Sequence, residues 1–301
     1  MAPPRPGEPL RVGIVKLASC DGCQLAFLDL GPPLLDIGVR FDIVEFAEAS
    51  SARAPDGPFD ILFVEGSVST AEQLRHVRHL RDRTGLLVTI GACATSGGIQ
   101  ALRAWADGSE GLARVVSAVY ATPTFVDTLA TATPIADHVT VDAELRGCPI
   151  DTGQLVELLT AAALGRRPQL PSEAVCLACK RAGRVCVMVA RGEPCLGPVI
   201  STGCGALCPG LARGCYGCFG PRESANTTSL AGWYRTTLGL SDEQVASRFA
   251  GFTSRAPEMR EIIDAAGGPP GLRAMSPTVS DRPTTTAVIP PDQVRVEGAQ
   301  P

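Results

Sequence analysis

Residues 10–24 read LRVGIVKLASCDGCQ, a short apolar run rich in β-branched residues that ends at a C-x-x-C pair, Cys20 and Cys23. The same arrangement recurs in residues 86–93, where the apolar run LLVTI is followed by Gly-Ala-Cys93. Cys148 follows a third such run, residues 139–145. Apolar strands that alternate with helices predict a parallel sheet covered on both faces. The first half of the chain therefore has the pattern of an α/β fold.

The other expected elements of this half follow from apolar runs and from capping pairs. Residues 39–46 and 59–64 have the pattern of two more buried strands, and residues 22–37 are helical in character. Ser69 with Glu72 predicts a capping box for a helix that reaches about Arg83. Asp151 with Gln154 predicts the start of a helix that ends near Leu164.

The composition changes after Pro168, which divides the chain into four expected regions. Residues 10–168 form the α/β domain, and residues 169–222 form an irregular domain with eight cysteines and many Gly and Pro. Residues 223–265 are expected to be a helical extension, with helices over 227–238, after a Ser241/Gln244 cap and from Pro257. Residues 266–301, rich in Gly, Pro and Thr, have the composition of a flexible tail.

Charge and cysteine content narrow the class of protein. The 301 residues carry a formal net charge of −4 and 5% aromatics, which gives nucleic-acid binding little support. No apolar run approaches the length of a membrane span, and the N-terminus lacks the apolar core of a secretion signal. Twelve cysteines in such a chain indicate metal ligands rather than disulfides, and hence a cytoplasmic location.

The first cysteine group consists of Cys20, Cys23, Cys93 and Cys148, each expected just beyond the carboxyl end of a strand. Ligands of an open α/β sheet bind at that edge, and four thiolates there supply the Cys₄ shell of a cubane iron–sulfur cluster. Two alternatives stay open. Cys93 and Cys148 could be ordinary buried cysteines, and a C-x-x-C pair alone also suits a thioredoxin-like redox site.

The other eight cysteines lie within 43 residues and make two further Cys₄ sets. Structural zinc is the alternative, because two C-x-x-C pairs also suit a zinc ribbon. Cys148 and Cys208 are each followed by proline, as is the last cysteine of bacterial ferredoxin motifs, which favours iron. These eight are Cys176, Cys179, Cys186, Cys195, Cys204, Cys208, Cys215 and Cys218.

The ordered motifs resemble a known family. SCDGCQ, VEGS, GACATSGG and GCP resemble the flavodoxin-like proximal-cluster domain of nickel–iron hydrogenase small subunits. The run PCLGPVISTGCGALCPGLARGCYGCFGP, residues 194–221, resembles the second half of the cytoplasmic, sulfhydrogenase and methanogen type. This family belongs to the superfamily of the 20 kDa subunit of NADH:ubiquinone oxidoreductase. The resemblance spans roughly residues 10–222.

The resemblance implies three 4Fe–4S clusters, electron transfer without catalysis by this chain alone, and two partners. One partner is a large subunit that carries the nickel–iron site, and the other is a flavin/NAD(P) or ferredoxin-like subunit. The implied ligand sets are Cys20, Cys23, Cys93 and Cys148 for the proximal cluster, Cys204, Cys208, Cys215 and Cys218 for the medial cluster, and Cys176, Cys179, Cys186 and Cys195 for the distal cluster.

Two positions differ from the periplasmic and membrane-bound members of the family. Those members use histidine where this chain has Cys176, and commonly have proline where it has Cys204. Thiolate in place of imidazole adds negative charge and lowers a cluster's potential, the reverse of the change in Rieske centres. The resemblance therefore implies a uniformly low-potential chain with a four-iron medial cluster.

Two other functions compete with this one: an iron–sulfur subunit of a complex-I-like oxidoreductase that lacks nickel, and a zinc-stabilised interaction protein. Glu65 is a candidate for tuning or relaying protons near the first cysteine group, or a loop acid satisfied by backbone amides. Asp21 and Gln24 are candidates for contact with the large subunit. His76 and His79 are expected to be solvated, and the pattern assigns no role to His138. The aromatic residues Trp105, Trp233 and Tyr234 are expected to serve packing or subunit contact rather than electron transfer.

Overall fold

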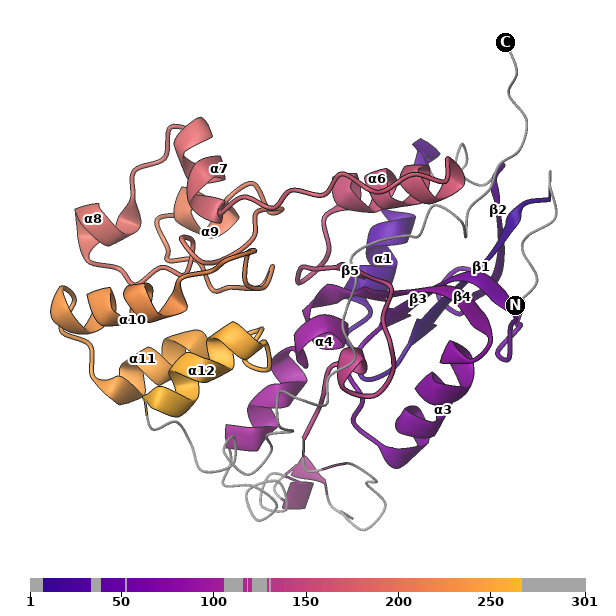
Figure 1. Cartoon of the computed structure of the whole chain (residues 1–301), viewed down its shortest axis with the longest axis horizontal. Helices are drawn as coiled ribbons and strands as arrows, with labels where there is room; N and C mark the ends of the chain where they lie inside the picture. Colours follow the sequence, from indigo (N-terminus) through magenta and orange to yellow (C-terminus); the bar gives the residue numbers. More distant parts are fainter. Residues whose placement is uncertain are drawn as a thin grey trace.

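The computed structural model describes residues 8–33, 39–51, 53–105, 116–117, 119–120, 129 and 131–266. The expected tail, residues 266–301, therefore lies outside the described residues except for Ala266, and so does the side chain of Trp105. Figure 1 shows a sheet half on one side and a lobe of short helices on the other.

The sheet has five parallel strands in the order β2-β1-β3-β4-β5. This is the flavodoxin-like strand order, and it confirms the predicted α/β fold. Its strands are β1 (Leu10–Lys16), β2 (Phe41–Phe46), β3 (Phe59–Glu65), β4 (Thr84–Ile90) and β5 (Ala143–Leu145).

Both faces of the sheet are covered by apolar side chains. On one face, α1 (Gly22–Leu28) and α6 (Thr152–Ala163) pack on β1, β3 and β4 around Phe27 and Phe63. On the other face, α3 (Ala71–Arg81) buries Val77 and Leu80 against the sheet. The helices lie on opposite sides of the strands in Figure 1. With both faces buried, the strands are apolar runs rather than alternating ones.

Several predicted boundaries were wrong, each for a local reason. The first helix ends at Leu28 instead of Ile37, just before Gly31 (φ +60°) and two prolines that cannot continue it. The second strand begins at Phe41, not Val39. The last strand spans only Ala143–Leu145, because the Val139 amide still donates to the Ile135 carbonyl, at 3.2 Å, in the turn that ends η3 (Ile135–Asp137).

The capping box of α3 was predicted one residue early. Thr70, not Ser69, accepts a hydrogen bond from the Gln73 amide through its Oγ1 at 3.1 Å. The Gln73 carboxamide oxygen accepts in return from the Thr70 amide. The extended backbone of Thr70 makes it the N-cap, so Gln73 rather than Glu72 completes the box. The predicted Asp151 cap and the Ser241/Gln244 capping box are confirmed.

The cysteine-rich segment shares one core with the helices that follow it. Residues from Val175 to Phe219 pack against Tyr234, Phe249 and Ile263, which lie on or beside the later helices. This segment has too few apolar residues to fold alone, and the helical extension completes its core. Its helices are α7 (Val175–Arg181), α8 (Val187–Arg191) and α9 (Leu207–Gly210), and those of the extension are α10 (Thr227–Thr236), α11 (Asp242–Phe249) and α12 (Pro257–Ala265).

A buried arginine joins the two halves. Arg255, just before α12, is 1% exposed and lies 3.7 Å from the carboxylate of Asp137 on η3. A Cβ on Gly97 would lie 3.0 Å from Arg255 Cγ, so the arginine stem passes against the end of α4 (Gly91–Ser96). The helical extension is therefore anchored beside the helix that carries Cys93.

Candidate iron–sulfur sites

The first cysteine group gathers at the carboxyl edge of the sheet. Cys20 and Cys23 lie in the loop after β1 and in the first turn of α1, Cys93 lies in α4 directly after β4, and Cys148 follows β5. Backbone pairing holds these loops together, since the Ala92 amide donates to the Gly147 carbonyl at 2.7 Å. The structure thus brings the four predicted side chains to one edge.

Two glycines leave room for the sulfur atoms. A Cβ on Gly91 would lie 2.4 Å from Cys23 Sγ, and one on Gly98 would lie 2.5 Å from Cys93 Sγ. Both glycines have positive φ, which other residues rarely adopt. Side chains at these positions would therefore displace the sulfurs.

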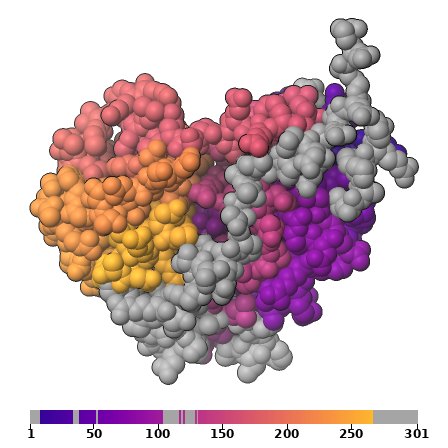
Figure 2. Space-filling view, viewed as in Figure 1, coloured from indigo at the N-terminus to yellow at the C-terminus, as the bar shows by residue number. Residues whose placement is uncertain are grey.

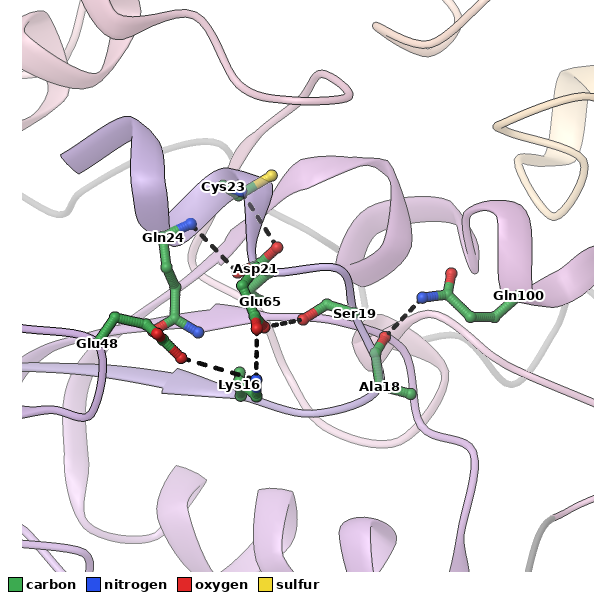
Figure 3. Close-up of polar contacts among 9 residues, drawn as sticks. All are labelled: Lys16, Ala18, Ser19, Asp21, Cys23, Gln24, Glu48, Glu65 and Gln100. Atoms are coloured by element: carbon green, nitrogen blue, oxygen red, sulfur yellow. Dashed lines mark hydrogen bonds and ion pairs between the residues drawn. The ribbon is translucent and has the colours of Figure 1, made fainter. Parts of the chain in front are cut away.

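Glu65 orients the C-x-x-C pair from the end of β3. Its carboxylate accepts hydrogen bonds from the Cys23 and Gln24 amides, both at 3.2 Å, at the start of α1 (Figure 3). Glu65 is 2% exposed, and burial raises the pKa of its carboxyl group. Of the two roles considered for Glu65, the contacts show the acid satisfied by backbone amides.

Asp21 does not use its side chain to cap α1. Its carboxylate instead accepts from Lys16 Nζ at 2.6 Å and from Ser19 Oγ at 3.3 Å (Figure 3). Lys16 also lies 3.7 Å from Glu48. Gln24 is fully buried within the chain, so its side chain does not reach the surface that was expected to contact a partner.

The sequence did not point to Gln100, which joins two of the loops. Its carboxamide nitrogen donates to the Ala18 carbonyl at 3.0 Å, and its oxygen accepts from Cys93 Sγ at 3.1 Å. Figure 3 shows the side chain directed toward the Ala18 loop. No motif marks this residue, because its hydrogen-bond partner Ala18 is 82 residues away in sequence.

The thiols of this group influence one another. Burial and the nearby sulfurs of Cys148 and Cys20 together raise the pKa of Cys93 to about 11. Burial, Glu65 and the sulfurs of Cys148 and Cys93 also raise the pKa of Cys23. Cys23, Cys93 and Cys148 therefore resist ionisation together, and a cationic group between them is what would stabilise their thiolates.

The four cysteines around α7 and α8 form a second neighbourhood. A Cβ on Gly197 would lie 3.3 Å from Cys195 Sγ and 3.5 Å from Cys176 Sγ, so both sulfurs border the same glycine. Burial raises the pKa of Cys176 to about 11, and the sulfurs of Cys195, Cys179 and Cys186 contribute. Cys186 is exposed to solvent.

The last four cysteines lie between the other two groups. Burial raises the pKa of Cys218 to about 12, with further contributions from Cys204, Cys148 and Cys208. Cys148 belongs to the group at the sheet edge. On the other side, the Cys215 amide donates to Cys195 Sγ at 3.1 Å, which links this group to the one around α7.

Each of the three cysteine groups has the number of thiols that a cubane cluster takes as ligands. In the described part of the chain, no three Cys, His, Asp or Glu side chains converge as the ligands of one metal ion do. The four thiolates of a cubane cluster bind four different irons, so they do not have to meet at one ion. Glycines border sulfurs in the group at the sheet edge and in the group around α7, which leaves room there for such a cluster.

The histidines and aromatic residues occupy structural positions. His79 pairs with Asp56, and His138 lies 2.7 Å from Thr133 Oγ1. Tyr234 is fully buried in ring contact with Phe249 and Trp233. None of the helices that the structure describes is both long and apolar enough to cross a membrane.

Comparison with known proteins places the chain in a family. Residues 20–162 match the family described as NADH ubiquinone oxidoreductase, 20 Kd subunit. The chain is 33% identical to the sulfhydrogenase 2 subunit delta of Pyrococcus furiosus over 243 residues, which is 81% of this chain and 99% of that subunit. It is 28% identical to a subunit of the F420-non-reducing hydrogenase vhu of Methanocaldococcus jannaschii, over 72% of this chain and 83% of that one.

A solved structure supports the fold. The actinobacterial-type NiFe-hydrogenase from Ralstonia eutropha H16 aligns with 71% of this chain and 79% of its own, at a TM-score of 0.52 and 17% identity. This likeness concerns the fold alone. At 33% identity over nearly the whole of the sulfhydrogenase subunit delta, the chain belongs to the family of hydrogenase subunits, and its residues 20–162 carry the match to the NADH ubiquinone oxidoreductase 20 Kd subunit.

Proposed function

We propose that this chain is the electron-transfer subunit of a nickel–iron hydrogenase and holds three 4Fe–4S clusters in a row. The observation that carries the proposal is the order of the three cysteine groups. Cys218 lies near Cys148 of the sheet-edge group, and the Cys215 amide contacts Cys195 of the group around α7. The middle group thus connects the other two.

The proposed ligand sets follow this order. Cys20, Cys23, Cys93 and Cys148 would hold the proximal cluster, Cys204, Cys208, Cys215 and Cys218 the medial cluster, and Cys176, Cys179, Cys186 and Cys195 the distal cluster. When bound, each cluster takes up and releases one electron. We also propose the domain limits 10–168, 169–222 and 223–265, with 266–301 as a tail.

The chain's own residues would position the clusters and set their surroundings. Glu65 fixes the turn that carries Cys20 and Cys23, and Gln100, on the segment after α4, donates a hydrogen bond to Ala18 at the start of the same turn. Backbone amides near sulfurs, such as that of Cys215 beside Cys195, raise a cluster's potential by donating hydrogen bonds. The protein thereby supplies geometry and electrostatics for the transfer.

The proposal also includes the proteins that bind this chain and the compartment in which it works. The proximal face would meet a large subunit with the nickel–iron site, and electrons would pass to a flavin/NAD(P) or ferredoxin-like partner. The named relatives are hydrogenase subunits, which supports the first partner. A reducing compartment keeps thiols available as ligands, so we include the cytoplasm in the proposal.

A second candidate is an iron–sulfur subunit of a nickel-free, complex-I-like oxidoreductase. The family match over residues 20–162 favours it, because that family is described by the NADH ubiquinone oxidoreductase subunit. The proposed function predicts that the complex purified anaerobically with this chain contains nickel, and that hydrogen gas reduces its clusters. Bleaching of the visible absorbance under hydrogen would support it. Retention of full colour under hydrogen, with no nickel in a complex that dithionite reduces, would favour the second candidate.

A further inference from the structure

One tyrosine hydroxyl in the lobe of short helices is buried without a hydrogen bond. Tyr234, on α10, is 0% exposed, and its hydroxyl has no partner among the residues that the structure describes. Its ring is held in edge contact by Trp233 and Phe249, with ring centroids 6.3 and 6.1 Å away. A buried hydroxyl without a hydrogen bond costs folding free energy, so native proteins seldom leave one in that state. The fixed ring therefore directs a hydroxyl that needs a partner.

This hydroxyl lies near the sulfurs of two cysteine groups. Tyr234 shares one buried core with Cys195, of the group around α7, and with Cys215, of the middle group. The Cys215 amide donates to Cys195 Sγ at 3.1 Å, so the two groups meet in this core. Figure 2 shows the helical extension, in orange to yellow, packed directly against the cysteine-rich segment. Tyr234 thus approaches the cysteines from a part of the chain that contains none.

The acceptor that the hydroxyl needs is a sulfur. Burial and the nearby Cys195 sulfur raise the pKa of Tyr234, so the hydroxyl keeps a proton to donate. The Cys195 amide also faces the hydroxyl, but an amide N–H only donates and leaves that proton without an acceptor. A water molecule in this position would need two or more polar partners, and the shared core is largely apolar. Cys195 Sγ is the acceptor that these contacts leave.

A sulfur that binds iron is well suited to this role. A neutral thiol is a weak acceptor, whereas a thiolate carries negative charge and accepts more strongly. Hydrogen bonds to the sulfurs of a cluster raise its potential, because the reduced cluster has one more negative charge and gains more from each donor. Cys195 Sγ already accepts from the Cys215 amide. A second donor on the same sulfur would act in the same direction.

We propose that Tyr234 donates an O–H···S hydrogen bond to Cys195 Sγ and thereby raises the potential of the distal cluster. This inference rests on the proposed function, because it requires a cluster that has Cys195 as a ligand. Tyr234 acts through that ligand, so it is a positioning residue and not an electron carrier. The helical extension then has a second role besides completing the core, since α10 helps to set the potential of a cluster.

The test removes this hydroxyl and keeps the ring. Tyr234→Phe is compared with Tyr216→Phe, a matched control: Tyr216 directly follows Cys215, but its hydroxyl accepts from exposed Arg213 at 3.3 Å. Redox titration followed by EPR of the full chain, purified anaerobically with its co-purifying subunits, gives the potential of each cluster. We expect Tyr234→Phe to disfavour reduction of the distal cluster by about tenfold, a fall of about 59 mV for one electron. Tyr216→Phe should change this equilibrium by less than about twofold, which is within the effect of a surface hydrogen bond.

A second substitution at the same position should have the opposite effect. Replacing Tyr234 by 3-fluorotyrosine keeps the hydroxyl and makes it a stronger donor, because fluorine withdraws electrons from the ring. The potential of the distal cluster should therefore rise. Equal potentials in the unmodified protein and in both Tyr234 variants would overturn the proposal. A shift of the same size in Tyr216→Phe would overturn it as well.

Thermal unfolding of the same samples provides an independent measurement. A hydroxyl without an acceptor costs stability, so Tyr234→Phe would then unfold at a higher temperature with unchanged potentials, and the proposal would be wrong. A hydroxyl bonded to the cluster ligand predicts a lower unfolding temperature. Three intact cluster signals with unchanged potentials count against the hydrogen bond alone, whereas missing signals in the unmodified protein count against the proposed function.

Discussion

At the scale of single residues, the glycines that border the sulfurs are the most restrictive positions. Gly91 has φ +84°, and a Cβ there would lie 2.4 Å from Cys23 Sγ. Gly31 also has positive φ (+60°), but a Cβ there would meet nothing within 4 Å. Substitutions at Gly91 and Gly31 therefore distinguish the cost of a strained backbone from the effect of a clash with a cysteine sulfur.

We predict that Gly91→Ala removes the proximal cluster, whereas Gly31→Ala costs only about 1–2 kcal/mol of stability from its strained backbone. Iron analysis and EPR of the two variants provide the measurement. Gly91→Ala should lose about four irons per chain, and Gly31→Ala should lose none. Full iron content in Gly91→Ala would show that Cys23 is not a ligand in this arrangement.

Cys176 provides a second prediction, about potential. Replacing one thiolate by imidazole removes a negative charge, so Cys176→His should raise the potential of the distal cluster, as histidine ligation does in Rieske centres. Redox titration followed by EPR gives the shift. Leu177→His is the control, because it places an imidazole next to Cys176 without replacing the thiol. Equal potentials in the two variants would exclude Cys176 as a ligand.

At the scale of elements, the turn between β1 and α1 depends on an acid from β3. Glu65 accepts hydrogen bonds from two amides at the start of α1, and Glu48 contacts the same area only through exposed Lys16. Glu65→Gln keeps the size but offers one amide an NH₂ group instead of an acceptor. We expect it to destabilise the protein by about 1–3 kcal/mol, compared with less than about 1 kcal/mol for Glu48→Gln.

Thermal unfolding of the cluster-loaded protein measures this difference. Equal unfolding temperatures for Glu65→Gln and Glu48→Gln would show that the Glu65 hydrogen bonds do not hold the turn. If the EPR signal of the proximal cluster shifts in Glu65→Gln but not in Glu48→Gln, the result would also show that the turn positions Cys20 and Cys23.

Elements were predictable from sequence where short-range chemistry defines them. Apolar runs located all five strands, and Ser241/Gln244 marked the start of α11, because strand burial and capping act over a few residues. Gly31 and the prolines after it were visible, yet the apolar pattern carried the predicted first helix past them. Thr70 was missed as a cap because adjacent Ser69 has equally suitable chemistry and only the backbone conformation distinguishes the two.

Contacts between distant residues were not predictable in the same way. The first four cysteines could be grouped because each follows an apolar run and has glycines nearby in sequence. Gln100 and Arg255 have no such marker, and their roles arise when the chain brings Ala18 and Asp137 beside them. The sequence therefore predicted that these four cysteines meet at one edge of the sheet, but not which residues hold their loops in place.

At the scale of the whole molecule, the two halves depend on a buried ion pair. Arg255 and Asp137 are 1% and 6% exposed and join the helical extension to the sheet half. Arg255→Met should destabilise the protein by about 3–5 kcal/mol, because it leaves the buried Asp137 carboxylate without this cation. Arg255→Met/Asp137→Leu should recover part of that loss, since neither charge then remains.

Urea unfolding of the full chain under anaerobic conditions gives the free energies for this comparison. A double variant as unstable as the sum of the two single variants would show that the two charges act independently. In that case the ion pair would not join the halves.

The central claim also concerns the whole molecule: one polypeptide carries three iron–sulfur clusters in a row. Quantitative iron and acid-labile sulfide analysis of the anaerobically purified full-length chain, with Mössbauer spectra of the same sample, tests it most directly. The account predicts about twelve irons and about twelve sulfides per chain, all in four-iron clusters. A colourless protein that holds about three zinc ions and no sulfide would contradict it.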